Sequence, residues 1–228
     1  MSRRGLVALG DSITNGRGEA TLGVPMQSWA QWLAEALELP FTKLARDGAR
    51  TADVLRDLVP RLRGPYDIGC LYIGVNDARS LDWDASAYER DARAILTALA
   101  AQSHRVLLCT LPTDLGRPRA APKPSKANEI IRALAAEHGA TIADLGDLSG
   151  TRMLLPDVVH PTALGQLEIA DRAARALGAT ALPSSLAEAH DSRRARARFA
   201  ARHTVLLARD LVRRADEGAR DRARRLLR

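Results

Sequence analysis

Short apolar runs alternate along the chain with longer segments whose apolar residues recur every three or four positions. The runs predict five buried strands, at Gly5–Leu9, Phe41–Ala45, Asp67–Ile73, Arg105–Leu111 and Ala140–Ala143. The segments between them predict amphipathic helices around Trp29–Leu37, Val54–Leu62, Tyr88–Leu99 and Ile130–Ala135, and a further helix over residues 162–177. Strands that alternate with helices pair in parallel, because a parallel connection needs a crossover. We therefore expect an α/β fold, a three-layer α/β/α sandwich around a five-stranded parallel sheet.

The size and composition suit one such domain that carries an appendage. The chain has 228 residues, 46% of them hydrophobic, which is enough to bury a sizeable core. No apolar run approaches the roughly 20 residues that cross a bilayer. The first run, Gly5–Leu9, is shorter than the about 7 to 15 residues of a signal-peptide core, so we expect a cytoplasmic protein. Cys70 and Cys109 lie inside apolar runs and are expected to be buried, unpaired thiols.

The net charge of +7 comes from the end of the chain. Residues 1–183 carry as many basic as acidic side chains, whereas residues 184–228 carry 13 Arg against 6 Asp and Glu. Pro183 and the two serines after it mark the boundary. The chain is therefore expected to divide into a neutral domain, residues 1–183, and a basic extension, residues 184–228.

The basic extension is predicted to form a long amphipathic helix over residues 195–226. Its apolar stripe, with steps of three and four, consists of Ala201, Val205, Ala208, Val212, Ala215, Ala219, Ala223 and Leu226. We expect the stripe to dock on the neutral domain or on a second copy of the chain, with the arginines in solvent. Two alternatives are anionic partners that the arginines would attract, either nucleic acid or membrane headgroups.

Candidate chemistry lies in the loops that follow the predicted strands. Ser12 follows the first strand, Gly48 the second and Asn76 the third. In open α/β sheets the site lies at the carboxyl ends of the strands, and in the flavodoxin-like strand order 2-1-3-4-5 these three loops are neighbours. Late in the chain, Asp157 precedes His160 by three residues, just before a predicted helix. A hydroxyl, a glycine, a carboxamide and an imidazole with a carboxylate are thus expected around one crevice.

Each feature alone also has a simpler structural interpretation. Ser12 suits an ordinary strand-to-helix turn, Gly48 a turn glycine and Asn76 a helix cap. Other chemical motifs are absent from the sequence, including the dinucleotide-binding G-x-G-x-x-G spacing, the P-loop, the G-x-S-x-G elbow and zinc-ligand spacings. The prediction therefore depends on the joint occurrence of the four features, in order, after alternating elements.

Together these blocks resemble the four sequence blocks of the SGNH hydrolases, also called the GDSL esterase/lipase family. The matching segments are GDSIT with Ser12, DGART with Gly48, GVNDA with Asn76, and DVVHP with Asp157 and His160. The resemblance covers residues 5–177. Two departures are small: Ile13 stands where leucine is usual after the serine, and Arg46 stands where many members have asparagine.

The resemblance implies a serine esterase that needs no metal and no cofactor. Ser12 would be the nucleophile, His160 its general base, and Asp157 the group that orients the imidazole. The backbone N–H groups of Ser12 and Gly48 and the side-chain amide of Asn76 would form the oxyanion hole. The expected substrate is a small soluble carboxylic ester with an acetyl or short-chain acyl group, and sugar acetates are among the candidates.

Two other functions fit the same residues. An acyltransferase would use the same site, with an alcohol in place of water. A non-catalytic scaffold or binding protein would act through its basic helix, although a scaffold has no need to retain all five site residues. Substrate choice is expected to depend on the loops at Arg17–Pro25, Ala78–Trp83 and Thr113–Lys123.

Overall fold

A parallel sheet forms the centre of the computed structural model. The structure describes residues 4–116, 120, 122–187, 189 and 191–226. Residues 213, 214 and 216–226 are described through their backbone alone. The strands of the sheet are β1 (Leu6–Gly10), β2 (Phe41–Ala45), β3 (Tyr66–Tyr72), β4 (Ser103–Cys109) and β5 (Thr141–Ala143). Neighbouring strands are parallel and follow the order β2-β1-β3-β4-β5. The predicted strands and their order are confirmed.

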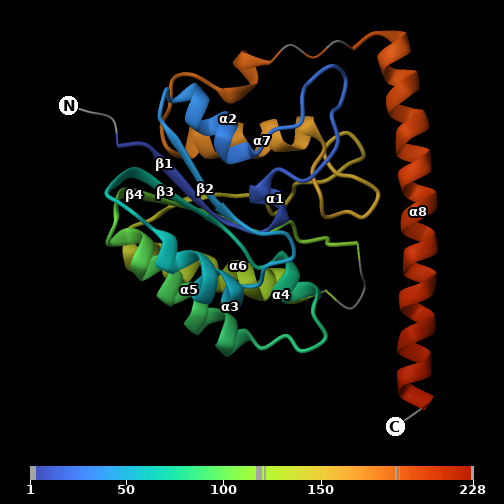
Figure 1. Cartoon of the computed structure of the whole chain (residues 1–228), viewed down its shortest axis with the longest axis horizontal. Helices are drawn as coiled ribbons and strands as arrows, with labels where there is room; N and C mark the ends of the chain where they lie inside the picture. The colour runs from blue at the N-terminus through green and yellow to red at the C-terminus, as the bar shows by residue number, and fades with distance from the viewer. Residues whose placement is uncertain (1–3, 117–119, 121, 188, 190, 227–228) are drawn as a thin grey trace.

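Helices cover both faces of the sheet. On one face α2 (Trp29–Ala36) packs against α7 (Ala163–Ala176), and on the other α5 (Ala85–Ala100) packs against α6 (Lys123–His138) (Figure 1). Three short helices, α1 (Ser12–Asn15), α3 (Thr51–Asp53) and α4 (Val75–Arg79), follow the carboxyl ends of β1, β2 and β3. The α/β/α sandwich is therefore confirmed, and its loops after the first three strands carry the candidate site.

The segment around residues 54–62 is less regular than the predicted α-helix. Val54–Leu58 forms a π-helical turn, in which the N–H of Val59 donates to the carbonyl of Val54. Val59–Arg61 then forms a tighter 3-10 turn. Pro60 explains the break, because it has no N–H to donate and its ring would clash with the carbonyl of Arg56 in a regular α-helix.

The two cysteines lie in the sheet, as predicted, on β3 and β4. Cys70 and Cys109 are both buried and unpaired. Burial raises the pKa of both thiols well above the usual value. Both side chains therefore act as small apolar residues of the core.

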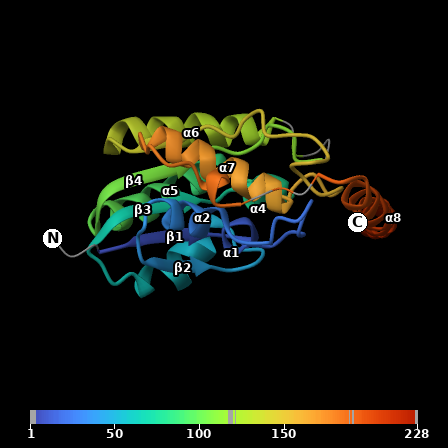
Figure 2. The same ribbon diagram turned by 90° about the horizontal axis from the view of Figure 1, so that it is seen from above.

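The predicted long helix is present as α8 (Arg193–Leu226) and stands outside the three layers, beside the carboxyl ends of the strands (Figure 1). Seen from above, it lies beyond the end of the sandwich that is opposite the start of β1 (Figure 2). Its less exposed side chains recur along one face, at Ala195, Phe199, His203, Leu206 and Asp210. Within the described part of the chain, none of the helices has the length and apolar character that spanning a bilayer requires.

Where the structure describes its side chains, up to Ala215, the predicted apolar stripe of α8 is exposed and does not pack on the domain. Val205 and Val212 of the stripe are 46% and 66% exposed. The helix instead turns Phe199 and Leu206 toward the loop at residues 17–25, since larger side chains bury more apolar surface than alanine does. The expected docking on the domain is therefore wrong for the described part of the stripe, and Ala219, Ala223 and Leu226 lie outside the described side chains. Its association with a second copy, nucleic acid or a membrane surface stays a prediction, as does the domain boundary at residue 183.

Candidate active site

The turn after β1 places Ser12 at the start of α1. Gly10 permits this turn, because a Cβ there would lie 2.6 Å from the carbonyl oxygen of Tyr72. Asp11 caps the helix, as its Oδ1 accepts a hydrogen bond from the N–H of Ile13 at 2.9 Å. Ser12 is the first helical residue, so by position its own N–H has no partner within the helix.

The fold brings Ser12 together with the two other residues predicted to work with it. The Oγ of Ser12 lies 3.0 Å from Nε2 of His160. On the other side of the ring, Nδ1 of His160 lies 2.6 Å from Oδ2 of Asp157. Ser12 and His160 are only 5% and 9% exposed. A hydroxyl, an imidazole and a carboxylate are therefore hydrogen-bonded in series and largely shielded from water.

The loop before α7 fixes the orientation of Asp157. Its Oδ1 accepts hydrogen bonds from the N–H groups of Val159 and His160, both at 3.0 Å. Burial alone raises the pKa of Asp157, but the hydrogen bond and charge of His160 and these N–H groups outweigh it and hold the pKa well below its usual range. Val158, which lies between Asp157 and Val159, has φ of 57°. This value is strained for a β-branched residue and persists only where surrounding hydrogen bonds impose it.

The other two predicted site residues lie on the loops after β2 and β3. Gly48 has φ of 74° in a turn closed by the N–H of Ala49 and the carbonyl of Arg46, and a Cβ there would meet nothing within 4 Å. Asn76, in α4, donates from Nδ2 to the carbonyl of Ala49 at 2.9 Å and contacts Oδ2 of Asp11 at 3.4 Å. Asn76 therefore connects the turn after β1 with the turn after β2, and one of its amide hydrogens makes only a long contact.

Two buried carboxylates adjoin these residues. Asp77 accepts a hydrogen bond from Oγ1 of Thr51 at 2.7 Å, which joins α4 to α3, and burial raises its pKa. Asp11 is fully buried, and burial, partly opposed by the hydrogen bond from Ile13, raises its pKa to about 7. Near neutral pH Asp11 is therefore partly protonated, which weakens its repulsion of negative charge that develops beside Asn76.

Gln166 of α7 is a positioning residue that sequence reasoning missed. It is fully buried, its Oε1 accepts from the N–H of Trp29 at 2.7 Å, and its Nε2 donates to the carbonyl of Ile13 at 3.0 Å. It thereby ties α7 to α2 and to the turn that carries the serine. The available signal was its place on the apolar face of a helix, where a buried polar group needs partners.

The C-terminal helix also reaches this site, which the sequence did not predict. A cavity of about 370 Å³, called here the site cavity, is lined by residues of the domain and of α8. The domain contributes Arg17, Gly18, Glu19, Leu155, Pro156, Asp157 and His160, and α8 contributes Leu206, Arg209 and Asp210. Arg202 of α8 holds the helix here through an ion pair with Glu19 at 2.7 Å.

Comparisons with known proteins identify a family for most of the domain. Residues 8–167 match the GDSL-like Lipase/Acylhydrolase family, so the matched part leaves out α8. No curated protein matches the chain.

Two solved structures illustrate the fold. LAE5, an alpha/beta hydrolase enzyme from the metagenome of Lake Arreo, Spain, is 19% identical with a TM-score of 0.62 and covers 78% of this chain and 97% of its own. Axe2, an acetylxylan esterase from Geobacillus stearothermophilus, is 19% identical with a TM-score of 0.60 and covers 78% and 95%. Catalytic mutants of Axe2, with a serine, an aspartate or a histidine changed to alanine, match as well. At this identity the likeness shows a common fold.

Proposed function

Because the chain belongs to the GDSL-like Lipase/Acylhydrolase family and is a carboxylic ester hydrolase, we propose that it cleaves small esters through an acyl-enzyme on Ser12. The observation that carries the proposal is the hydrogen-bonded series from Ser12 through His160 to Asp157. A serine hydroxyl is a weak nucleophile that needs a base, and the base needs a third group to fix its tautomer. With Nδ1–H donating to Asp157, Nε2 of His160 is free to accept the serine proton.

In the first half-reaction, Oγ of Ser12 attacks the ester carbonyl carbon while Nε2 of His160 takes the serine proton. Asp157 stays ionised, because its pKa is well below the usual range, and stabilises the imidazolium. His160 then gives the proton to the alcohol oxygen as the ester C–O bond breaks. The alcohol leaves, and the acyl group stays on Ser12.

In the second half-reaction, His160 removes a proton from water, whose oxygen attacks the acyl carbon. The proton returns to Oγ of Ser12 as the carboxylic acid departs. In both halves negative charge develops on the carbonyl oxygen. The N–H groups of Ser12 and Gly48 and the amide of Asn76 are the proposed donors to it, and one such donor is worth about 2.7 to 4 kcal/mol.

The acyl group is proposed to be acetyl or another short chain. Support comes from Axe2, which shares the fold and is described as an acetylxylan esterase. Acetyl esters, including sugar acetates, are therefore the first substrates to offer.

The proposal is tested by offering p-nitrophenyl acetate and a fluorophosphonate probe to the wild type and to Ser12→Ala. We expect the probe to label the wild type alone and the variant to lose at least about 10⁴-fold in kcat. Ser125→Ala, which changes an exposed serine on α6, is the matched control and should behave as the wild type. Labelling that persists in Ser12→Ala would exclude this nucleophile. Analysis of products with an added alcohol separates hydrolysis from acyl transfer.

A further inference from the structure

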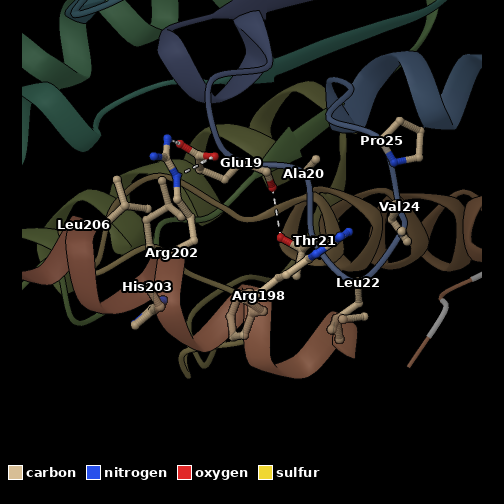
Figure 3. Close-up of a pocket in the computed structure, with 14 residues that line it drawn as sticks. Glu19, Ala20, Thr21, Leu22, Val24, Pro25, Arg198, Arg202, His203 and Leu206 are labelled. Atoms are coloured by element: carbon tan, nitrogen blue, oxygen red, sulfur yellow. Dashed lines mark hydrogen bonds and ion pairs between the residues drawn. The ribbon is translucent and has the colours of Figure 1, made fainter. Parts of the chain in front are cut away.

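A second hollow lies beside the site cavity and shares part of its wall. This hollow, called here the apolar groove, has a volume of about 480 Å³ and lies between the loop at residues 17–25 and α8 (Figure 3). Glu19, Leu155 and Leu206 line both the groove and the site cavity. The two spaces therefore adjoin each other.

The exposed surface of the groove is mainly apolar, although Glu19, Arg198, Arg202 and His203 also line it. The loop contributes Leu22, Val24 and Pro25, and α8 contributes Ala195 and Phe199, with Leu206 toward the site cavity. The loop turn is held by paired backbone hydrogen bonds between Thr21 and Val24, at 3.1 and 3.0 Å, so this wall is in place without a ligand. From Leu206 to Ala195 the helix runs about 16 Å at 1.5 Å per residue. The groove is thus long enough for an alkyl chain or an aromatic ring.

The chemistry of His160 indicates which half of an ester this groove receives. His160 hands its proton to the departing alcohol oxygen, so the alcohol portion of the ester lies on the side of the imidazole. The site cavity has His160 in its wall and shares Glu19, Leu155 and Leu206 with the groove. On the side of α3 and α4, by contrast, the cavity lined by Arg50, Asp77 and Trp83 is smaller, at about 120 Å³.

We propose that the apolar groove binds the alcohol portion of the ester, and that this portion is an apolar alcohol with an alkyl or aromatic body. The assignment rests on the proposed serine esterase and specifies its substrate class: a short acyl group on an apolar alcohol. It also makes α8, which lies outside the family match, a wall of the substrate site. Leu206 and Phe199 become specificity-determining residues.

The experiment compares two ester series with the full-length protein. In the first series the acyl group is constant and the alcohol grows, from ethyl through butyl to octyl acetate. In the second the alcohol is constant and the acyl group grows, from p-nitrophenyl acetate through butyrate to octanoate. A fully buried methylene adds about fourfold. Because the groove is partly open, we expect kcat/KM to rise about tenfold or more from ethyl to octyl acetate, with a smaller gain in the acyl series.

Adjacent leucines on α8 provide matched variants. Leu206 lines the groove, whereas Leu207 is 43% exposed. Leu206→Asp is expected to lower the octyl-to-ethyl ratio about tenfold, because a charge in the wall opposes apolar burial. Leu207→Asp should leave the ratio and the rate with ethyl acetate unchanged. Phe199→Asp, in the groove but outside the site cavity, should also lower the ratio, and competitive inhibition by 1-octanol reports the same subsite in any variant with low activity.

Three outcomes would overturn the assignment. One is a flat alcohol series in the wild type, and another is a larger gain along the acyl series, which would give the groove to the acyl chain. The third is an equal loss in Leu206→Asp and Leu207→Asp. Failure of the proposed function looks different, since p-nitrophenyl acetate hydrolysis would then persist in Ser12→Ala.

Discussion

Buried hydrogen bonds hold the residues around Ser12, whereas an exposed ion pair and a few apolar contacts hold α8. Asp11 and Gln166 are both fully buried, and each forms hydrogen bonds to the backbone of the serine turn or to its neighbours. The ion pair that ties α8 to the domain joins side chains of Arg202 and Glu19 that are 52% and 31% exposed. Buried polar groups cost several-fold more to leave without partners than exposed ones do.

This difference separates two tasks within one site. The reacting atoms need positions fixed to a fraction of an ångström, which the buried network of the domain supplies. A wall that contacts the substrate only through apolar surface needs a complementary shape, but its atoms need not be placed as exactly as the reacting atoms, because apolar burial is not directional. The chemistry is therefore expected to be sensitive to changes in the domain, and the substrate range to changes in α8.

The largest effect is expected for Asn76→Ala. Loss of one oxyanion donor should lower kcat about 10² to 10³-fold, whereas loss of the hydrogen bond to the carbonyl of Ala49 should lower the stability by only about 1 to 3 kcal/mol. Steady-state kinetics with p-nitrophenyl acetate measures it. Asn15→Ala removes another carboxamide near the site, one that donates to Asp47 on the surface, and should change kcat less than about twofold. Equal kcat in Asn76→Ala and the wild type would remove Asn76 from the mechanism.

Asp11→Asn tests the buried network through pH. The pKa of Asp11 is raised to about 7, so the folded state keeps a proton that the unfolded state loses near pH 4. The contribution of Asp11 to the free energy of unfolding is therefore complete below about pH 4 and is lost as pH rises through about 7, by a few kcal/mol. Asparagine keeps the acceptor for Ile13 and does not ionise. The free energy of unfolding, measured in urea at pH 5 and pH 8, should rise for the variant relative to the wild type from the lower to the higher pH. A difference between the two proteins that does not depend on pH would contradict this.

Gln166→Leu should destabilise the domain by about 1 to 3 kcal/mol, because the buried N–H of Trp29 loses its partner, while the carbonyl of Ile13 keeps only the N–H of Gly16. Equilibrium unfolding in urea measures the loss. Gln31→Leu is the control: Gln31 lies on α2 and donates only to the surface carboxylate of Glu35 at 3.1 Å, so its loss should be within about 0.5 kcal/mol. Similar stabilities of the two variants would show that burial of Gln166 contributes little.

The sequence predicted those parts of the site whose signals are local. Ser12, Gly48 and Asn76 each follow an apolar run directly, so the strand order was enough to bring their loops together. Asp157 and His160 are close in sequence, and one loop joins them. Gln166 was missed, because a glutamine in an amphipathic helix is usually assigned to the exposed face. Its partners lie 137 and 153 residues away, and only the packing of α7 on α2 reveals them.

The face of α8 that was predicted to contact the domain was wrong for a related reason. Its stripe is built mostly of alanine, which buries little area, so the hydrophobic pattern only weakly specifies a face. Phe199 and Leu206 lie off that stripe, and the loop at residues 17–25 offers them a wall that no local pattern reveals. The irregular helix at residues 54–61 was missed for another reason. Its apolar periodicity suits an α-helix, but periodicity takes no account of proline, and Pro60 has no N–H to donate.

The smallest effect is expected for the ion pair between Glu19 and Arg202. A double-mutant cycle compares Glu19→Gln, Arg202→Gln and the double variant by the amide exchange rates of α8. The coupling between the two side chains should correspond to less than about a fivefold change in these rates, because an exposed ion pair is only slightly more favourable than its two separately hydrated charges. Added salt should reduce even this coupling, since it screens exposed charges. Hydrogen exchange is the suitable measurement, as it reports the local opening of α8 without unfolding of the domain. A coupling that persists at high salt and matches the loss in Gln166→Leu would mean that the helix is held as firmly as the serine turn, and the division between a rigid chemical site and an adaptable substrate wall would fail.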